Sequence, residues 1–120
     1  MSEEILDIVD EFDNVIGQAT RDEATDKGLS QRFVRTLVQN TQNEFVFFQR
    51  TYHPKDIYSG CWDAPGGRVR AGESYQNAAV RELKEEFGIK VDNLIEISKL
   101  HAIRPDYQLF GRLYFVIHDG

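Results

Sequence analysis

The segment SYQNAAVRELKEEF (residues 74–87) constrains the fold of this chain more than any other stretch. Its alanines, leucine, lysine and glutamates favour helix, Ser74 can cap the start, and Gly88 is well placed to end it. On a helix with about 100° per residue, Leu83 and Phe87 fall on one apolar stripe. The sequence therefore predicts a helix over 74–87 that packs one face on a sheet.

An acidic arc adjoins that stripe, made of Glu82, Glu85 and Glu86. Like charges four apart on a helix destabilise it by about 0.2–0.5 kcal/mol, so their grouping needs a reason. The ordinary interpretation is a solvated charged face, but such faces usually intersperse acids with Lys or Arg. Here the helical wheel directs Arg81 and Lys84 away from the arc. A bound cation is therefore the more informative hypothesis.

Two glycines, Gly66 and Gly67, precede this helix. Without side chains they let the backbone approach closely, so a free carbonyl could join the carboxylates. Carboxylate and carbonyl oxygens are the ligands that hard divalent cations prefer. The pattern predicts a site for Mg²⁺ or Mn²⁺.

Charge and cysteine content narrow the setting. The formal net charge of -6 and the pI near 5.0 argue against a nucleic acid polymer as partner. Cys61 is the only cysteine, which excludes an intrachain disulfide and a Cys-rich zinc site. The N-terminus lacks a signal pattern, and no apolar run approaches the roughly 20 residues that span a bilayer. We expect a soluble, cytoplasmic protein that does not bind a membrane.

Most of the remaining chain has the composition of strands and turns. Residues 31–39 and 44–50, separated by Asn40–Asn43, predict the clearest hairpin, and 20–30 suits a loop or a short helical turn. The stretch 51–60 reads as a surface loop. The predicted strands are 5–9, 15–19, 31–39, 44–50, 93–103 and 108–117. Strands, one helix and then more strands predict an α+β fold or a layered α/β/α fold.

Residues 67–89 resemble the signature box of the Nudix hydrolases. That box is written G, five residues, E, seven residues, R-E-U-x-E-E-x-G-U, where U is a bulky aliphatic residue. Every fixed position is filled here, by Gly67, Glu73, Arg81, Glu82, Leu83, Glu85, Glu86, Gly88 and Ile89. So many specified residues at fixed spacing make the motif specific.

The resemblance implies a Nudix fold, an α/β/α sandwich with a mixed β-sheet. It implies one Nudix domain over residues 1–120, with an N-terminal hairpin extension at about 1–30. It also implies an enzyme, a metal-dependent diphosphohydrolase. The expected reaction cleaves the diphosphate linkage of a nucleoside diphosphate derivative or a similar small organic diphosphate.

Carried over by position, the resemblance makes Glu82, Glu85 and Glu86 the ligands of Mg²⁺ (or Mn²⁺), with the Gly66 carbonyl as a fourth candidate. Independent chemistry agrees with this assignment, because a dication offsets the charge of a diphosphate and lowers the pKa of bound water. An acidic protein would thus recruit an anionic substrate through its metal.

The resemblance also implies the catalytic residues. Glu82 or Glu85 would accept the proton of the attacking water, and the sequence leaves both open. Arg81 would orient a carboxylate, either Glu73 or Glu82, by a charge-assisted hydrogen bond. The catalytic set is therefore Glu73, Arg81, Glu82 and Glu85.

Arginines close to the box could contact the substrate phosphates. Arg50 and Arg68 are our candidates for substrate binding, and Arg70 is a third. The alternative for each is an ordinary surface arginine, which is the commoner case.

A second resemblance concerns residues 7–24 and 28–38, which are similar to the N-terminal region of isopentenyl diphosphate isomerases and their Nudix relatives. Gln31 stands where the GLxHR pattern of those isomerases would place a histidine. APGGR at 64–68 occupies the segment that would carry the catalytic cysteine, and Cys61 precedes that position. The resemblance therefore favours a hydrolase with an isomerase-like N-terminal extension, and keeps an isomerase as an alternative.

A non-catalytic module that binds a nucleotide is the remaining alternative. Degenerate boxes usually mark such modules, whereas this box is intact. Metal-dependent phosphate release would separate the enzyme from the module.

The sequence stops at Gly120, shortly after the strand predicted over 108–117. Nudix domains normally continue with a loop, a strand and a helix that covers the other face of the sheet. We therefore expect the C-terminal part of the fold, including that covering helix, to be missing. Phe110, Leu113 and Phe115 would be exposed, and such apolar patches tend to associate. Either a truncated chain or a homodimer is expected.

Overall fold

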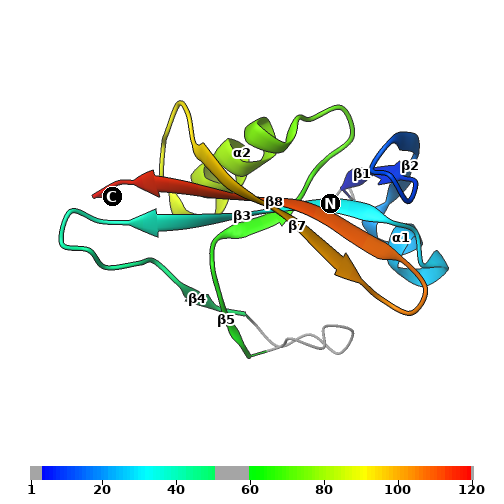
Figure 1. Ribbon diagram of the computed structural model, residues 1–120, viewed down its shortest axis with the longest axis horizontal. Coiled ribbons are helices and arrows are strands. Elements are labelled where there is room, and N and C mark those ends of the chain that lie inside the picture. Colours follow the sequence, from blue (N-terminus) through cyan, green and yellow to red (C-terminus); the bar gives the residue numbers. More distant parts are fainter. Residues whose placement is uncertain (1–3, 51–59, 120) are drawn as a thin grey trace.

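A mixed β-sheet forms the centre of the molecule, with its longer helix lying on one face (Figure 1). The computed structural model describes residues 4–50 and 60–119. The helices are α1 (Arg21–Lys27) and α2 (Tyr75–Phe87). The strands are β1 (Ile5–Val9), β2 (Val15–Thr20), β3 (Gln31–Gln39), β4 (Phe48–Gln49), β5 (Trp62–Asp63), β6 (Gly66–Arg68), β7 (Ile95–Ile103) and β8 (Gln108–Ile117). The sheet has the order β2-β1-β3-β8-β7 with β6 paired to β3, while β4 and β5 pair separately.

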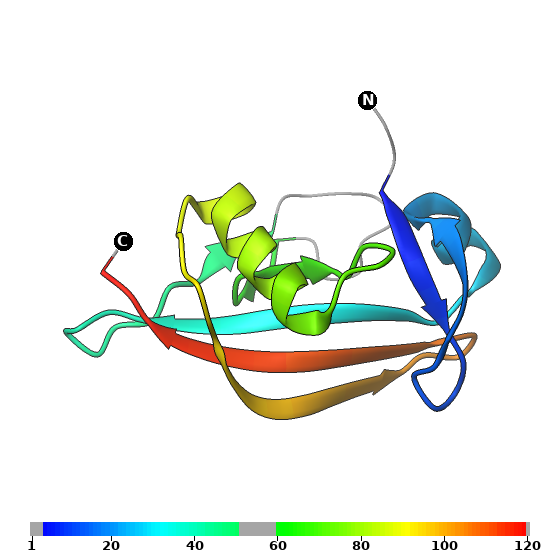
Figure 2. The ribbon, with the colours of Figure 1, turned by 90° about the horizontal axis from the view of Figure 1, so that it is seen from above.

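β3 and β8 run parallel at the centre of the sheet, and every other strand pair is antiparallel. Successive residues of a strand point to opposite faces, so Val34, Val38 and Tyr114 share one face. That face is buried against Leu83 of α2, and Figure 2 shows the helix lying across it. The predicted α+β class with a mixed sheet is confirmed.

Helix α2 has the ends that its sequence predicts. The Ser74 side chain accepts a hydrogen bond from the backbone N–H of Asn77, and Gly88 closes the helix at φ 66°. Leu83 is fully buried, and Phe87 packs partly buried on the same core. The predicted apolar stripe is therefore the packing face.

Residues 20–30 contain the short helix α1, capped by the Thr20 hydroxyl and ended by Gly28 at φ 65°. Its Ala24 packs with Ile8 of β1 and Ala19 of β2. The predicted hairpin of 5–9 and 15–19 is confirmed as β1 and β2. Together β1, β2 and α1 form the N-terminal hairpin region at one end of the sheet.

The hairpin predicted from 31–39 and 44–50 forms only at its turn. Gln39 and Phe45 form an isolated β-bridge, and the Val46 N–H donates to the Val38 carbonyl at 2.9 Å. Beyond this point the second arm leaves the sheet and continues as β4. The prediction of a full second strand is wrong because β6 already occupies that edge of β3. Of the predicted 51–60 loop, residues 51–59 lie outside the described residues.

The face of the sheet turned away from α2 carries apolar side chains of β7 and β8. Leu113 and Phe115 are half-buried there, and Ile95 and Ile117 are 64% and 58% exposed. Within residues 4–50 and 60–119, no helix covers this face. The expectation for Phe110 is wrong, since alternation places it on the α2 side, where its ring stacks on His101 at 4.5 Å.

No helix among the described residues has the length and apolar character to cross a membrane.

Candidate functional site

A cavity of about 310 Å³ lies where α2, β6 and the start of β1 meet. Four glutamates and five arginines line it, together with Gly66 and Gly67 of β6. The glutamates are Glu4, Glu82, Glu85 and Glu86, and the arginines are Arg21, Arg35, Arg50, Arg68 and Arg70. The three glutamates of the predicted acidic arc therefore share one cavity, which we call the charged cavity.

The two glycines of β6 make room for charged side chains on opposite faces of that strand. A Cβ atom added to Gly67 would collide with the Glu82 carboxylate. A Cβ added to Gly66 would collide with the Val34 carbonyl and the Arg35 side chain. The close approach predicted for these glycines thus has a specific reason, because Glu82 lies directly on the strand backbone.

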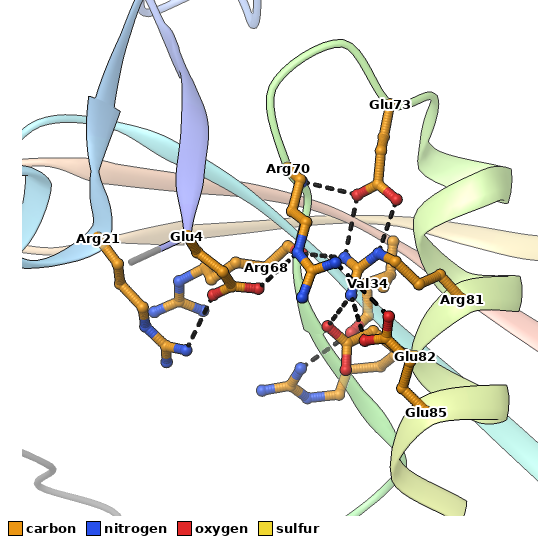
Figure 3. Close-up of polar contacts among 10 residues, drawn as sticks. Glu4, Arg21, Val34, Arg68, Arg70, Glu73, Arg81, Glu82 and Glu85 are labelled. Atoms are coloured by element: carbon orange, nitrogen blue, oxygen red, sulfur yellow. Dashed lines mark hydrogen bonds and ion pairs between the residues drawn. The ribbon is translucent and has the colours of Figure 1, made fainter. Parts of the chain in front are cut away.

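Arg81 is the hub of the carboxylates on and before α2 (Figure 3). Its Nε and Nη2 donate to the two oxygens of Glu73 at 2.7 and 2.9 Å, a bidentate pair. Its Nη1 donates to Glu82 at 2.9 Å and to Glu85 at 3.3 Å. The Arg68 carbonyl accepts a further bond at 3.0 Å. The wheel-based expectation that Arg81 points away from the arc is wrong, because its long side chain folds back over it.

These contacts set the ionisation of the site. Burial raises the pKa of Glu82, and the charge of Arg81 only partly offsets that effect. Burial also acts on Glu73, but hydrogen bonds from Arg81 and the Arg70 backbone outweigh it and hold the pKa of Glu73 below its usual value. Glu73 and Glu82, which both bind Arg81, therefore have pKa values shifted in opposite directions.

Carboxylate oxygens have the chemistry that a hard divalent cation requires, but Arg81 and Arg70 hold these carboxylates in the structure. Glu85 lies 3.3 Å from Arg81 and 3.5 Å from Arg70, and Glu86 lines the same cavity. Within residues 4–50 and 60–119, no group of three or more His, Cys, Asp or Glu side chains is arranged to hold a metal ion. Metal binding would thus require Glu82 and Glu85 to exchange their arginine contacts for the cation.

The carbonyl of Gly66, which the sequence predicts as a fourth ligand, points away from β3. The carbonyl of Arg68 points from β6 toward Arg81, away from β3. Carbonyls alternate in direction along a strand, so the Gly66 carbonyl, two residues earlier, points the same way. It therefore faces the charged cavity that it lines.

The arginines predicted from the sequence also line the charged cavity. Arg50 lies 3.4 Å from Asp63, and Arg70 contacts Glu4 at 3.2 Å. Arg68 donates to Gln31 at 3.0 Å, and burial lowers the pKa of Arg68 to about 10. At neutral pH its guanidinium still carries a full charge.

Sequence reasoning missed three lining residues, namely Glu4, Arg21 and Arg35. Glu4 forms ion pairs with Arg21 at 3.6 Å and with Arg70 at 3.2 Å. These two pairs link the N-terminal hairpin region to the box. None of the three lies in a motif. The strand pairing that brings them here involves residues far apart in sequence.

Strand β1 also holds the loop that precedes α2. Leu6 bridges Arg70, the Ala71 N–H donates to the Ile5 carbonyl at 2.8 Å, and the Gly72 N–H donates to the Asp7 carboxylate at 3.1 Å. Asp7 is buried, and this hydrogen bond gives its carboxylate a partner that replaces water. The loop carrying Glu73 is therefore anchored from outside the box.

The position predicted for an isomerase histidine has a structural role here. Gln31 is 2% exposed, donates to the Leu29 carbonyl at 3.3 Å and accepts from Arg68. It is absent from the lining of the charged cavity. The residue thus supports Arg68 and adds no ligand beside the box glutamates.

Comparison with known proteins gives a consistent result. A family model described as the NUDIX domain matches residues 29–119. A protein of Pseudomonas aeruginosa named an uncharacterized Nudix hydrolase is 36% identical over 118 residues, covering 98% of this chain and 69% of that protein. One from Nostoc sp., named likewise, is 39% identical over 121 residues, covering 97% and 70%.

Solved structures show the same fold. The crystal structure of a Deinococcus radiodurans protein superposes with a TM-score of 0.69 at 29% identity, covering 98% of this chain and 74% of that one. The crystal structure of a MutT protein from Methanosarcina mazei gives a TM-score of 0.63 at 24% identity, covering 75% of this chain and 67% of that one. Residues 4–28, outside the family match, still supply Glu4 and Arg21 to the charged cavity.

Proposed function

The chain belongs to the Nudix hydrolase family, and on that premise we propose that it hydrolyses the diphosphate linkage of a nucleoside diphosphate derivative or similar organic diphosphate. The observation that carries the proposal is the charged cavity, where Glu82, Glu85 and Glu86 meet the backbone of β6. Hard oxygen donors gathered at a cavity of this volume suit a cation and a small anionic substrate.

The proposal assigns the cation, Mg²⁺ or Mn²⁺, to Glu82, Glu85, Glu86 and the Gly66 carbonyl. When bound, such a cation neutralises phosphate charge and lowers the pKa of water. Glu82 or Glu85 would accept the proton of the attacking water. The raised pKa of Glu82 favours it for this role, since a proton acceptor works best when its pKa is near the working pH.

Arg81 and Glu73 would act by positioning. The bidentate pair between them fixes the guanidinium. The Nη1 atom, which takes no part in that pair, donates to Glu82 and Glu85. Such a clamp limits the rotation of the glutamates before the cation and substrate arrive. Arg50 and Arg68 are proposed to bind substrate phosphates.

The domain extent, the kind of substrate and the cellular location belong to the same proposal. We treat residues 1–120 as one Nudix domain with a small-molecule substrate and a cytoplasmic location. The isomerase alternative gains nothing from the buried Gln31, and a non-catalytic module would leave the intact box without a use.

A substrate screen tests the proposal directly. Nucleoside diphosphate sugars, dinucleotides, nucleoside triphosphates and isopentenyl diphosphate are each incubated with the protein and Mg²⁺ or Mn²⁺, and products are separated by chromatography. We expect metal-dependent cleavage of at least one anhydride, abolished by EDTA. Rearrangement of isopentenyl diphosphate without cleavage would favour the isomerase. Nucleotide binding without turnover would favour the module.

A further inference from the structure

Strand β6 has a free edge, and the charged cavity continues around it. β6 pairs with β3 through Arg68 opposite Phe33 and Gly66 opposite Arg35. No strand pairs with its other edge among the described residues. The box glutamates lie on the α2 side of this edge, whereas Arg35 and Arg68 extend from the opposite side, because paired residues share a face.

Arg68 is a partly buried cation with no matching anion among the described residues. Its Nε donates a hydrogen bond to the neutral amide oxygen of Gln31 at 3.0 Å. Within residues 4–50 and 60–119, no carboxylate lies within 4.0 Å of its guanidinium. Burying an unpaired charge is costly, so an uncompensated guanidinium at a cavity wall is a candidate for binding an anion.

Arg35 adds a second cation on the same side of β6. Its Nε lies 3.3 Å from Asp63, and the same carboxylate oxygen lies 3.4 Å from Arg50. One carboxylate is thus shared by two guanidinium groups. The missing side chain of Gly66 lets Arg35 lie close against β6, next to the cavity.

We propose that Arg68 and Arg35 form a subsite for a terminal phosphate group, so that the preferred substrate ends in a free phosphate and is not capped on both sides of its diphosphate. This inference rests on the proposed function. A terminal phosphate carries about -1.5 to -2 charges at neutral pH and presents three oxygens. An internal phosphate carries a single charge and presents only two free oxygens to the guanidinium groups. Guanidinium forks also match phosphate oxygens geometrically.

The geometry separates the two ends of the substrate. Glu82, Glu85 and Glu86 take the cation on the α2 side, and the arginine subsite takes the terminal phosphate on the other side of the free β6 edge. A nucleoside triphosphate satisfies both requirements. A nucleoside diphosphate sugar places an uncharged ring where Arg68 requires an anion.

Binding of inorganic pyrophosphate in EDTA tests the subsite without catalysis. Calorimetry compares the wild type with Arg68→Met and with Lys84→Met, which removes a cation from the exposed side of α2. Losing charge-assisted hydrogen bonds should weaken pyrophosphate binding about 10- to 100-fold in Arg68→Met. The Lys84→Met affinity should stay within about twofold, as for a screened surface charge. Equal affinity of Arg68→Met and wild type, or no wild-type binding at millimolar pyrophosphate, would overturn the proposal.

Steady-state kinetics then test the substrate class. kcat/KM is measured for a nucleoside triphosphate and a nucleoside diphosphate sugar with the same nucleoside. Arg68→Met should lower kcat/KM for the triphosphate about 10- to 100-fold and kcat/KM for the diphosphate sugar by a clearly smaller factor. Equal losses on both substrates would overturn the proposal. If the wild type cleaves neither substrate, the proposed hydrolysis fails, while the pyrophosphate titration still decides the subsite.

Thermal unfolding checks that the variants fold. Should Arg68→Met not fold, Arg68→Lys carries the test, because it keeps the charge and loses the planar fork. It should bind pyrophosphate roughly three- to tenfold more weakly than the wild type. An affinity equal to that of the wild type would contradict a forked contact.

Discussion

Two cavities of nearly equal volume differ completely in how their charges are used. The charged cavity measures about 310 Å³. The second, about 300 Å³, lies between the β1–β2 turn and strands β7 and β8, and we call it the aromatic cavity. Its lining residues are Phe12, Asp13, Lys99, Leu100, His101, Phe110 and Arg112. Volume alone would not distinguish them.

Four charged side chains beside the aromatic cavity, namely Asp13, Arg32, Glu96 and Arg112, satisfy one another. Asp13 lies 2.7 Å from the Arg32 Nε and accepts a hydrogen bond from the Tyr75 hydroxyl at 2.7 Å. Arg112 sits 4.1 Å above the Tyr75 ring and 3.5 Å from Glu96. This closed set fastens the β1–β2 turn to β3, β8 and α2. The comparison teaches that a ligand site is marked by charge that the protein leaves unmatched.

Removing one box carboxylate should give the largest effect. Glu82→Gln keeps the shape beside Gly67 and removes the charge, so turnover should fall about 100-fold or more. The matched control is Glu96→Gln beside the aromatic cavity, which should leave turnover within about twofold. Steady-state assays on the substrate found by screening measure both. Similar losses in the two variants would erase the distinction between the cavities.

Arg81→Ala should have the next largest effect. It releases Glu73, Glu82 and Glu85 together, so turnover should fall about 10- to 100-fold through their misorientation. The partly buried carboxylates left unpaired should also lower the free energy of unfolding by about 2–4 kcal/mol. Assays and urea unfolding test the two parts separately. Arg81→Lys, which cannot form the bidentate pair, should recover only a fraction of each.

Breaking the closed set should affect stability and spare turnover. Tyr75→Phe removes the hydrogen bond to Asp13 and retains a ring below Arg112, so unfolding should become easier by about 1–2 kcal/mol. Turnover should stay within about twofold. A large loss of turnover in Tyr75→Phe would mean that both cavities serve catalysis.

The smallest expected effect is a pH dependence. Hydrogen bonds from Arg81 and the Arg70 backbone outweigh burial and depress the pKa of Glu73 from 4.5. A depressed carboxyl pKa stabilises the folded state above the unfolded value and loses that contribution as pH falls through the folded value. The stability gap between wild type and Glu73→Gln should therefore narrow below about pH 4.5. Urea unfolding across this range, with Glu11→Gln on the exposed turn as control, measures it. A constant gap would contradict the shift.

Sequence patterns predicted what is local. The ends of α2, its apolar stripe and the acidic arc all depend on contacts within a few residues, and the structure has them where expected. Arg35 and Glu4 could not be predicted, because they reach the cavity through the pairing of β3 with β6 and through β1. No local signal encodes those registers.

The wrong expectations have the same origin. Phe110 and Leu113 lie on opposite faces of β8, and only the register decides which face meets α2. The second arm of the 44–50 hairpin was expected beside β3, an edge that β6 takes from later in the chain. The direction of Arg81 depended on a flexible side chain, which a helical wheel of Cα positions does not describe.

The bonds between β1 and residues 70–72 make the N-terminal hairpin region and the box loop energetically coupled. By thermodynamic reciprocity, a ligand that orders the loop tightens the docking of β1 by the same free energy, and a change that loosens β1 weakens the ligand. A spectroscopic label on the distant, exposed β1–β2 turn would therefore report occupancy of the charged cavity. Amide exchange at Ala71 and Gly72 would follow the same equilibrium from the other side.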